Sequence, residues 1–357
     1  MATTAIHGGV KTVVPFRVCD LGGWTDTWFS NSGNVLNLGV LCRYFGANGP
    51  YRGIRVIISG KKVPPSESRI AIEAADPLFD QQILVAQLDD ADTVSKNLLL
   101  AGISLIDRKC LHGHVTQIDI SSVFPPGGSV GTSASVNVGT IAALNAYYDC
   151  RMTPNQIAQT AWRAETEVMG GQSGTQDQYS AAFGHGVNAI AISKFPRTTC
   201  REVEVSNATR KALEKGLITV FYGQHDSSAM HTRVIRELEG TKNSPILKVL
   251  RQLPQEAEHC LRRDDLVGFG RAMQQNTEAQ RELCDELVSH KANAFINIAR
   301  HCGAIGWKVN GAGGAGGSIT LLFRSRRAAT NFHAECRTNY TPELGYLYFE
   351  HQLSQCD

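Results

Sequence analysis

The chain has 357 residues, of which 42% are hydrophobic and 19% are charged, so it is long enough to bury one large core or two moderate ones. Its formal net charge of +2 gives no broad electrostatic footprint for nucleic acid or for an anionic membrane. The longest apolar run, Leu98 to Ile106, is much shorter than the roughly 18 residues that span a bilayer. These properties indicate that the partner is a small molecule rather than nucleic acid or membrane.

The N-terminal stretch and the cysteines indicate a reducing compartment. "MATTAIHGGV" lacks the apolar segment of a signal peptide. The 10 cysteines are scattered and contain no C-x-x-C pair, so a zinc or redox site has weak support. We interpret them as buried free thiols and expect a cytoplasmic protein.

Hydrophobic patterns along the chain predict an α+β protein with a seam near Lys194 to Thr199, which divides it into domains 1–195 and 196–357. Residues 244–302 are predicted to be mostly helical. Further helices are predicted over 93–108 and 153–170, the second with Thr153 as N-cap, Pro154 at the first position and Gln156 completing a capping box. Strands are predicted over 11–21, 34–40, 51–59, 114–121, 188–193 and 217–223, and a strand, glycine loop and strand over 305–323.

The stretch "FPPGGSVGTSASVNVG", Phe124 to Gly139, places glycines and hydroxyl side chains directly before a helix. Glycines allow close backbone approach, and a helix N-terminus offers unpaired N–H groups to an anion. The stretch matches neither the Walker loop, which needs a lysine, nor a G-x-G-x-x-G dinucleotide turn. It therefore predicts a phosphate cradle of another kind, with a flexible loop before a capped helix as the alternative.

Two glutamates of the helix predicted over 153–170 differ in position. Glu165 falls on the apolar stripe, whereas Glu167 lies four residues beyond Arg163 on the expected solvent side. A carboxylate on an apolar face is costly unless it is paired or binds a cation. A buried ion pair and Mg²⁺ both satisfy that requirement, and the nearby phosphate cradle favours Mg²⁺.

The stretch "VPFRVCDLGGWTDTW" places Arg17 and Asp26 on either side of a Gly-Gly turn, with Trp24 between them. A tight hairpin with an exposed Arg17–Asp26 salt bridge is one interpretation. The other is a carbohydrate pocket, in which an acid binds sugar hydroxyls and an aromatic ring covers the apolar face of the sugar.

Three motifs in this order resemble those of the GHMP superfamily of small-molecule kinases. "RVCDLGGWTDT" is similar to the sugar-binding segment of galactokinases and closer to that of fucokinases and heptose-phosphate kinases. "PPGGSVGTSAS" resembles the superfamily's phosphate loop, and "KVNGAGGAGGSITLL" its C-terminal glycine motif. "RAETEVMGGQSGTQDQY" resembles the galactokinase segment that holds the catalytic aspartate. The resemblance implies an N-terminal phosphate-loop domain and a ferredoxin-like C-terminal domain.

The resemblance also implies roles for individual residues. Asp177 matches the carboxylate that takes or orients the acceptor proton, and Arg17 matches the arginine that stabilises charge beside it. Ser133 and Glu165 match the Mg²⁺ ligands. The substrate-binding positions correspond to Asp26, Trp24, Gly23, Ser173 and Gly174. The phosphate loop corresponds to Pro126, Gly127, Gly128, Ser129, Val130, Gly131, Thr132, Ser133 and Ala134, and the C-terminal motif to Gly311, Gly313 and Gly314.

The function implied by the resemblance is an ATP- and Mg²⁺-dependent sugar kinase, acting on the anomeric hydroxyl of an unphosphorylated hexose or deoxyhexose. Gly23 and Trp24 stand where galactokinases carry Glu-His, so galactose is expected to be a poor substrate. Trp24 acting as a hinge or core residue is the alternative. Other candidate functions are a heptose-phosphate kinase, a kinase for a non-sugar alcohol, and a silent regulator that binds sugar and ATP. A monomer or a homodimer is expected.

Overall fold

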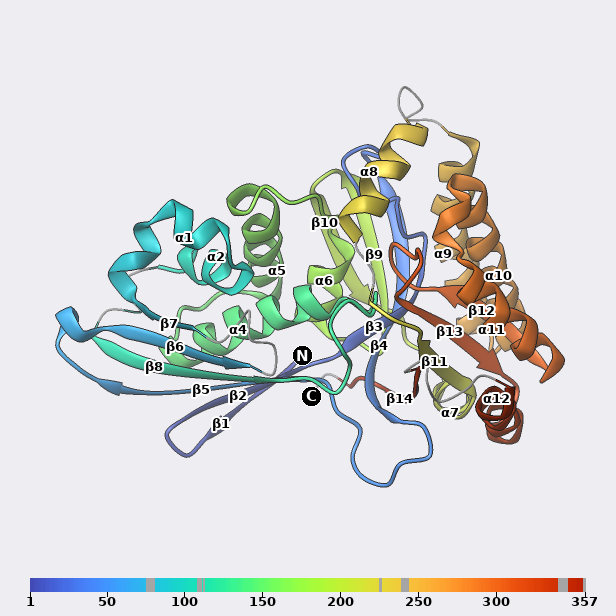
Figure 1. Ribbon diagram of the computed structural model, residues 1–357, viewed down its shortest axis with the longest axis horizontal. Coiled ribbons are helices and arrows are strands. Elements are labelled where there is room, and N and C mark those ends of the chain that lie inside the picture. The colour runs from blue at the N-terminus through green and yellow to red at the C-terminus, as the bar shows by residue number, and fades with distance from the viewer. Residues whose placement is uncertain are drawn as a thin grey trace.

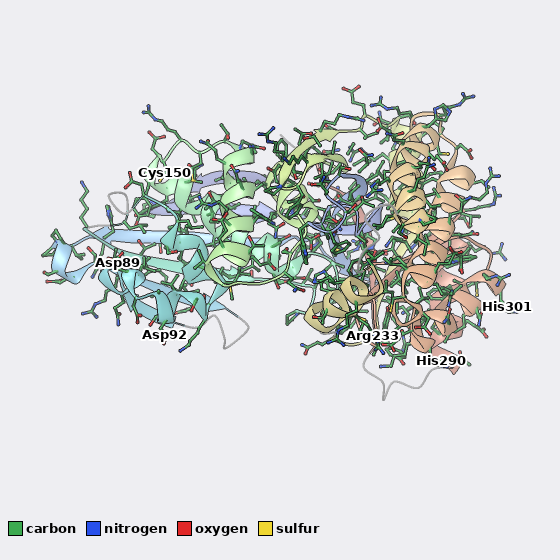
Figure 2. The ribbon with its side chains drawn as sticks, turned by 90° about the horizontal axis from the view of Figure 1, so that it is seen from above. Asp89, Asp92, Cys150, Arg233, His290 and His301 are labelled. Atoms are coloured by element: carbon green, nitrogen blue, oxygen red, sulfur yellow. The ribbon has the colours of Figure 1, made fainter. Side chains whose placement is uncertain are left out.

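The computed structural model consists of two β-sheets with helices packed on them (Figure 1). Figure 2 shows the molecule from above, with Asp92 and Cys150 toward one end and His290 and His301 toward the other. The described residues are 1–74, 81–107, 111, 113–224, 227–238, 244–339 and 346–355.

The first sheet, over the described residues, has the strand order β1-β2-β5-β8-β6-β7. Neighbouring strands in this sheet run antiparallel, except β6 and β8, which run parallel to each other. Alternating burial along β2 and β8 shows that one face is packed and the other partly open. The strands are β1 (Ala2–Ile6), β2 (Gly9–Val14), β5 (Ile54–Lys62), β6 (Arg69–Ala74), β7 (Gln81–Leu84) and β8 (His114–Ser121).

Helix α4 covers this sheet and begins at the glycine-rich stretch of the sequence. It packs on β2 and β5, where a Cβ added to Gly139 would lie 3.0 Å from side-chain atoms of Val14 and Val56. The predicted capping box of α5 is confirmed. The helices of this half are α1 (Ala91–Ser95), α2 (Leu98–Ser104), α4 (Thr132–Tyr148), α5 (Pro154–Arg163) and α6 (Gln176–Phe183).

The prediction of one helix over 93–108 is wrong in part. The chain forms α1 and α2 instead, because the Asn97 side chain accepts hydrogen bonds from Leu99 N and Leu100 N and begins a new helix. Residue 108 lies outside the described residues.

The second sheet combines strands from both parts of the chain, in the order β10-β9-β4-β14-β11-β13-β12, with β3 also paired to β4. A single strand over 11–21 was expected, but Pro15 cannot donate to a ladder and separates β2 in the first sheet from β3 in the second. The strands are β3 (Phe16–Leu21), β4 (Gly33–Tyr44), β9 (Val187–Lys194), β10 (Arg197–Glu202), β11 (Leu217–Phe221), β12 (Ala304–Val309), β13 (Ser318–Phe323) and β14 (Leu347–Leu353).

The remaining helices pack around the second sheet. α9 and α10 pack on each other, α9 contacts β3 and β4, and α11 contacts β12 and β13, so the helical prediction for 244–302 is confirmed. The boundary at 195/196 falls in the β9–β10 hairpin and stays a prediction. The helices are α7 (Asn207–Gly216), α8 (Ser227–Leu238), α9 (Pro245–Arg262), α10 (Leu266–Leu283), α11 (His290–His301) and α12 (Arg326–Asn339).

Short helical turns complete the described chain: η1 (Pro65–Glu67), η3 (Val85–Asp89), η4 (Ala164–Val168) and η5 (Asp285–Leu287). In the described part of the chain, no helix has both the length and the apolar character needed to cross a membrane. The described cysteines are all free thiols, and Cys110 and Cys356 lie outside the described residues.

Candidate active site

A cavity of about 290 Å³ brings together segments that are far apart in the sequence. The phosphate-loop stretch, the start of α6, the turn after β3, helix α8 and the glycine loop after β12 all contribute to its wall. The residues that line it are Arg17, Trp24, Asp26, Thr27, Gly127, Gly128, Ser129, Gly131, Thr132, Ser133, Ala134, Glu165, Gln172, Ser173, Gly174, Gln176, Asp177, His231, Gly311 and Ala312.

One wall of the cavity is the N-terminus of α4. Gly131 is the N-cap residue, with a φ of 71°, and no side chain caps the first turn. The Thr132 hydroxyl is buried and has no hydrogen-bond partner among the described residues. Uncapped N–H groups, the helix dipole and an unpartnered hydroxyl together form a site suited to an anion such as phosphate.

Arg17 and Asp177 face each other beside this wall. The guanidinium donates from Nε to Asp177 Oδ1 at 2.6 Å and from Nη2 to Asp177 Oδ2 at 3.1 Å, which is a bidentate ion pair. Nη1 also donates to the Ser129 carbonyl at 2.5 Å. Although burial lowers the pKa of Arg17, the Asp177 and Asp20 carboxylates raise it overall. The interpretation of an exposed Arg17–Asp26 salt bridge is wrong, because Arg17 is buried and pairs with other carboxylates.

Asp26 is buried against the turn that leads into α6. Its Oδ2 accepts from Gln176 N at 3.0 Å, and a Cβ on Gly174 would lie 2.1 Å from the same oxygen, so only glycine fits there. Burial, with a further contribution from the negative charge of Asp177, raises the pKa of Asp26 to about 6. A buried acid of this kind hydrogen-bonds well to the hydroxyls of a ligand.

Glu165 lies where the helix changes its pitch. α5 ends at Arg163 and the chain continues as a π-helical turn, with Met169 N donating to Ala164 O, so the uninterrupted helix predicted over 153–170 is wrong. The predicted surface pair of Arg163 and Glu167 is confirmed, at 2.7 Å. The wider turn lets Glu165 reach the cavity while Glu167 stays at the surface.

The surroundings of Glu165 suit a cation. Its Oε2 accepts from Gln178 Nε2 at 2.7 Å, and its polar contacts among the described residues are uncharged. Burial, with a further contribution from Asp177, raises the pKa of Glu165 to about 7. A half-buried carboxylate beside a hydroxyl and an anion site fits Mg²⁺, which binds one or two carboxylates together with substrate phosphates.

Trp24 is also part of the cavity wall. It has a φ of 76°, is 4% exposed, and its Nε1 has no hydrogen-bond partner among the described residues. Its ring meets that of His231, on α8, edge to face at 5.2 Å and packs in a cluster with Leu247 and Leu250 of α9. Trp24 is therefore both a packed residue and a wall of the cavity.

Most of the predicted site residues line this cavity. Gly23, Pro126, Val130, Gly313 and Gly314 are not among the cavity residues. Val130 is fully buried in the core, where its carbonyl accepts from Arg17 N.

Several cavity residues were not predicted. Thr27, Gln172 and Gln176 are polar neighbours of predicted residues in the sequence and could have been included on that basis. His231 comes from α8, and no motif in that helix indicates a site.

Models of two protein families match the chain: "GHMP kinases N terminal domain" over residues 97–185 and "GHMP kinases C terminal" over residues 257–341. The chain belongs to the GHMP kinase family. The two matches lie on either side of the predicted boundary, and the N-terminal match contains the phosphate loop, Glu165 and Asp177.

Relatives of this GHMP family member differ in what their names say they act on. It is 25% identical over 232 residues to a galactokinase of Pyrococcus furiosus, covering 58% of this chain and 64% of that protein. It is 24% identical over 206 residues to a mevalonate kinase of Methanocaldococcus jannaschii, covering 58% and 61%. The chain thus aligns with less than two thirds of the length of these relatives.

Solved structures confirm the two-domain GHMP kinase fold. A D-glycero-D-manno-heptose 1-phosphate kinase of Bacteriodes thetaiotaomicron superposes with a TM-score of 0.69 at 18% identity, covering 97% of this chain and 96% of that one. At this identity the likeness concerns the fold alone.

Proposed function

We propose that this GHMP family member is a phosphotransferase that moves the γ-phosphate of ATP to a hydroxyl of a small, uncharged sugar, the anomeric C1 hydroxyl of an unphosphorylated hexose or deoxyhexose. The observation that carries the proposal is the bidentate Arg17–Asp177 pair beside the uncapped N-terminus of α4 in one cavity. A carboxylate that can take a proton therefore lies next to an anion site, which is the arrangement that phosphoryl transfer to an alcohol requires.

The residues present divide the chemistry between them. The first-turn N–H groups of α4 and the Thr132 hydroxyl bind phosphate oxygens, and Arg17 neutralises charge that develops on the transferred group. The Asp177 carboxylate accepts the proton of the attacking hydroxyl. Asp26 holds other hydroxyls of the acceptor and fixes its orientation.

Mg²⁺ is proposed as the metal, with Glu165 and Ser133 as its protein ligands. When bound, it would neutralise phosphate charge. Both side chains line the cavity, and the Glu165 carboxylate has no charged protein group of opposite sign to balance it among its described contacts.

The charges of the cavity favour an uncharged acceptor. Among the described residues that line it, Arg17 is the only lysine or arginine, and two carboxylates already pair with it. Asp26, Glu165 and Asp177 contribute negative charge to the same wall. A sugar phosphate or a carboxylate substrate would need a further cation at this wall, so a neutral sugar fits better than a heptose phosphate or mevalonate.

Trp24 favours a substrate with an apolar face. Its ring covers C–H groups, and its unpartnered Nε1 can donate to one oxygen of the sugar. A 6-deoxyhexose is the first candidate, with a heptose second. A silent regulator that binds sugar and ATP remains the alternative of another class, but retention of Arg17, Asp177 and Glu165 in one cavity supports turnover. The cytoplasmic location and the oligomeric state stay predictions.

The test is an ADP-release assay on a panel of free and phosphorylated sugars and mevalonate, followed by mapping of the phosphate on the product. Release with a free hexose or deoxyhexose, phosphorylated at C1, is expected. Turnover of only phosphorylated or carboxylate acceptors would overturn the substrate class. Sugar-dependent binding of ATP without any ADP release would favour the regulator.

A further inference from the structure

A bulge in β3 turns a buried carboxylate toward the active site. The pairing of β3 with β4 shifts between Val18 and Leu21, and Cys19, within this bulge, has a φ of 56°. Cys19 N donates to the side chain of Asn310 at 2.9 Å, which fixes the bulge against the end of β12. The residue that follows, Asp20, is 0% exposed.

Asp20 contacts groups from three segments. Its Oδ1 lies 3.5 Å from Arg17 Nη1 and 3.4 Å from Nζ of Lys308, which is also 0% exposed. Gly311 N donates to its two carboxylate oxygens at 3.0 and 3.2 Å. One carboxylate thus joins the arginine of the active site to the glycine loop after β12.

The negative charge of Asp20 is compensated by the positive charges of Arg17 and Lys308. Burial would raise the pKa of Asp20, but Lys308 and Arg17 outweigh it and lower the pKa. Burial lowers the pKa of Lys308, and Asp20 opposes that shift. The Lys308 ammonium also donates to the Val309 carbonyl, so it contacts a backbone oxygen as well as the Asp20 carboxylate.

The position of Gly311 matters because it touches the active-site wall. A Cβ added there would lie 3.1 Å from Arg17 Nη2 and 3.2 Å from the Ser129 carbonyl. From the other side, Gln280 of α10 donates to the Gly311 carbonyl at 3.2 Å. Gly311 is therefore fixed through its N–H by Asp20 and through its carbonyl by α10.

We infer that Asp20 is a positioning residue for the proposed phosphoryl transfer: it holds the Arg17 guanidinium and the Gly311 backbone in place at the phosphate loop, while Lys308 balances its charge. The inference rests on the proposed function. Displacement of a catalytic group by about 1 Å can cost about 10²-fold in rate, so a residue that fixes Arg17 acts on kcat without touching the substrate.

A purely structural ion pair is the competing explanation, and a double variant separates the two. Asp20→Asn/Lys308→Met removes both charges, so neither is left buried and unpaired. The expected result is a kcat about 30-fold lower than that of the wild type, because Arg17 loses its second carboxylate, with the KM of the sugar changed less than about threefold. A structural pair predicts instead that kcat recovers once both charges are gone.

Glu350→Gln is the matched control. Glu350 is also 0% exposed and pairs with two arginines, Arg43 and Arg326, but none of the three lines the cavity. The variant is expected to lose stability while its kcat stays within about twofold of the wild type. If Asp20→Asn/Lys308→Met fails to fold, Asp20→Glu carries the comparison, because it keeps both charges and shifts the carboxylate by one methylene, with a smaller expected fall in kcat of about fivefold.

Amide hydrogen exchange tests the inference without relying on activity. Exchange at Gly311 should become at least about tenfold faster in the Asp20 variants and stay unchanged in Glu350→Gln. If the wild type releases no ADP with any acceptor, the proposed function fails, and the exchange measurement still decides whether Asp20 fixes the loop. A wild-type kcat in Asp20→Asn/Lys308→Met, or unchanged exchange at Gly311, would overturn the inference.

Discussion

The two ends of the cavity, the proposed phosphate end (Arg17, Thr132 and the N-terminus of α4) and the proposed acceptor end (Trp24, Asp26 and Gln176), are built in different ways. At the phosphate end, Arg17 is held by Asp177, by Asp20 and by the Ser129 carbonyl, and the backbone of the loop is fixed against it. At the acceptor end, the Trp24 Nε1 and the Gln176 Oε1 are buried polar atoms with no partner among the described residues. At the phosphate end the charged side chains pair with one another, and the groups without a partner among the described residues are the Thr132 hydroxyl and the uncapped N–H groups of α4, whereas at the acceptor end they are one neutral donor and one neutral acceptor.

This difference between the two ends indicates that one end promotes the reaction and the other selects the substrate. A preorganised charge cluster stabilises a transition state that is the same for every acceptor. Unpartnered polar groups reject substrates that cannot pair with them, because a buried donor or acceptor left unsatisfied is costly. Changes at the phosphate end should therefore reduce rate for all acceptors, and changes at the acceptor end should alter the choice among them.

The largest effect is expected from Asp177→Asn, which keeps the shape of the side chain and removes its ability to take a proton. Turnover should fall at least about 10²-fold for every acceptor while nucleotide binding persists, measured by ADP release and by titration with ATP. Asp149→Asn, at an exposed carboxylate paired with Arg151, is the control and should keep full activity. Activity near the wild-type level in Asp177→Asn would contradict the assignment of the base.

Glu165→Gln tests whether the metal belongs to the phosphate end. The Mg²⁺ concentration needed for half-maximal rate should rise at least about tenfold, because the carboxylate proposed as a ligand is lost. Glu167→Gln, two residues away at the surface, should leave it unchanged. Equal behaviour of the two variants would show that Glu165 is not a metal ligand.

Trp24→His tests the acceptor end. We expect kcat/KM for a deoxyhexose relative to galactose to fall by about tenfold, with the rate for the best acceptor changing less. Histidine tolerates the left-handed backbone of this position better than most residues. Trp28→His is the control, since Trp28 is half-buried nearby and does not line the cavity. Galactose as the best substrate of the wild-type protein would reverse the prediction.

The smallest effect concerns stability and pH in the metal-free protein. Burial raises the pKa of Glu165 from 4.5 to about 7. Between pH 4.5 and pH 7, Glu165 is therefore protonated in the folded state and ionised in the unfolded state, and this difference in proton binding affects stability. This contribution to stability is complete below about pH 4.5 and disappears as the pH rises through 7. The Tm of Glu165→Gln should therefore exceed that of the wild type by about 2–5 °C at pH 7.5 and by little at pH 4.5.

Comparing the variant with the wild type is necessary because other groups titrate. Burial lowers the pKa of His351 to about 3, so its contribution to stability falls as the pH drops through 6.5, the opposite direction. That contribution is common to both proteins and cancels in the difference. A difference in Tm that does not grow with pH would mean that the Glu165 pKa is not raised.

Most residues that the sequence assigned to the phosphate end line the cavity, because the pattern that marks them is local. Gly131 lies directly before α4 and Thr132 is its first residue, and the capping box of α5 is contained in four consecutive residues. The acceptor end was predicted less completely because it depends on tertiary packing. His231 reaches Trp24 only because α8 packs beside the turn after β3, and no local pattern encodes that contact.

Two errors have the same origin. The exposed Arg17–Asp26 bridge was inferred from closeness in sequence, whereas Arg17 finds its partner 160 residues away, at Asp177. The break between β2 and β3 occurs at Pro15, which the sequence shows. That β2 and β3 belong to different sheets becomes visible only in the assembled structure. Long-range ion pairs and sheet assignment are the features that local patterns do not fix.

The shared sheet has a consequence for how the chain can be divided. The last strand, β14, pairs with β4 from Leu353 opposite Val40 to Phe349 opposite Tyr44. A fragment ending at residue 195 would leave this edge of β4 without its neighbour, and an unprotected strand edge recruits other chains. Fragments 1–195 and 196–357 should aggregate when produced separately and regain a soluble, folded form only when they are produced together.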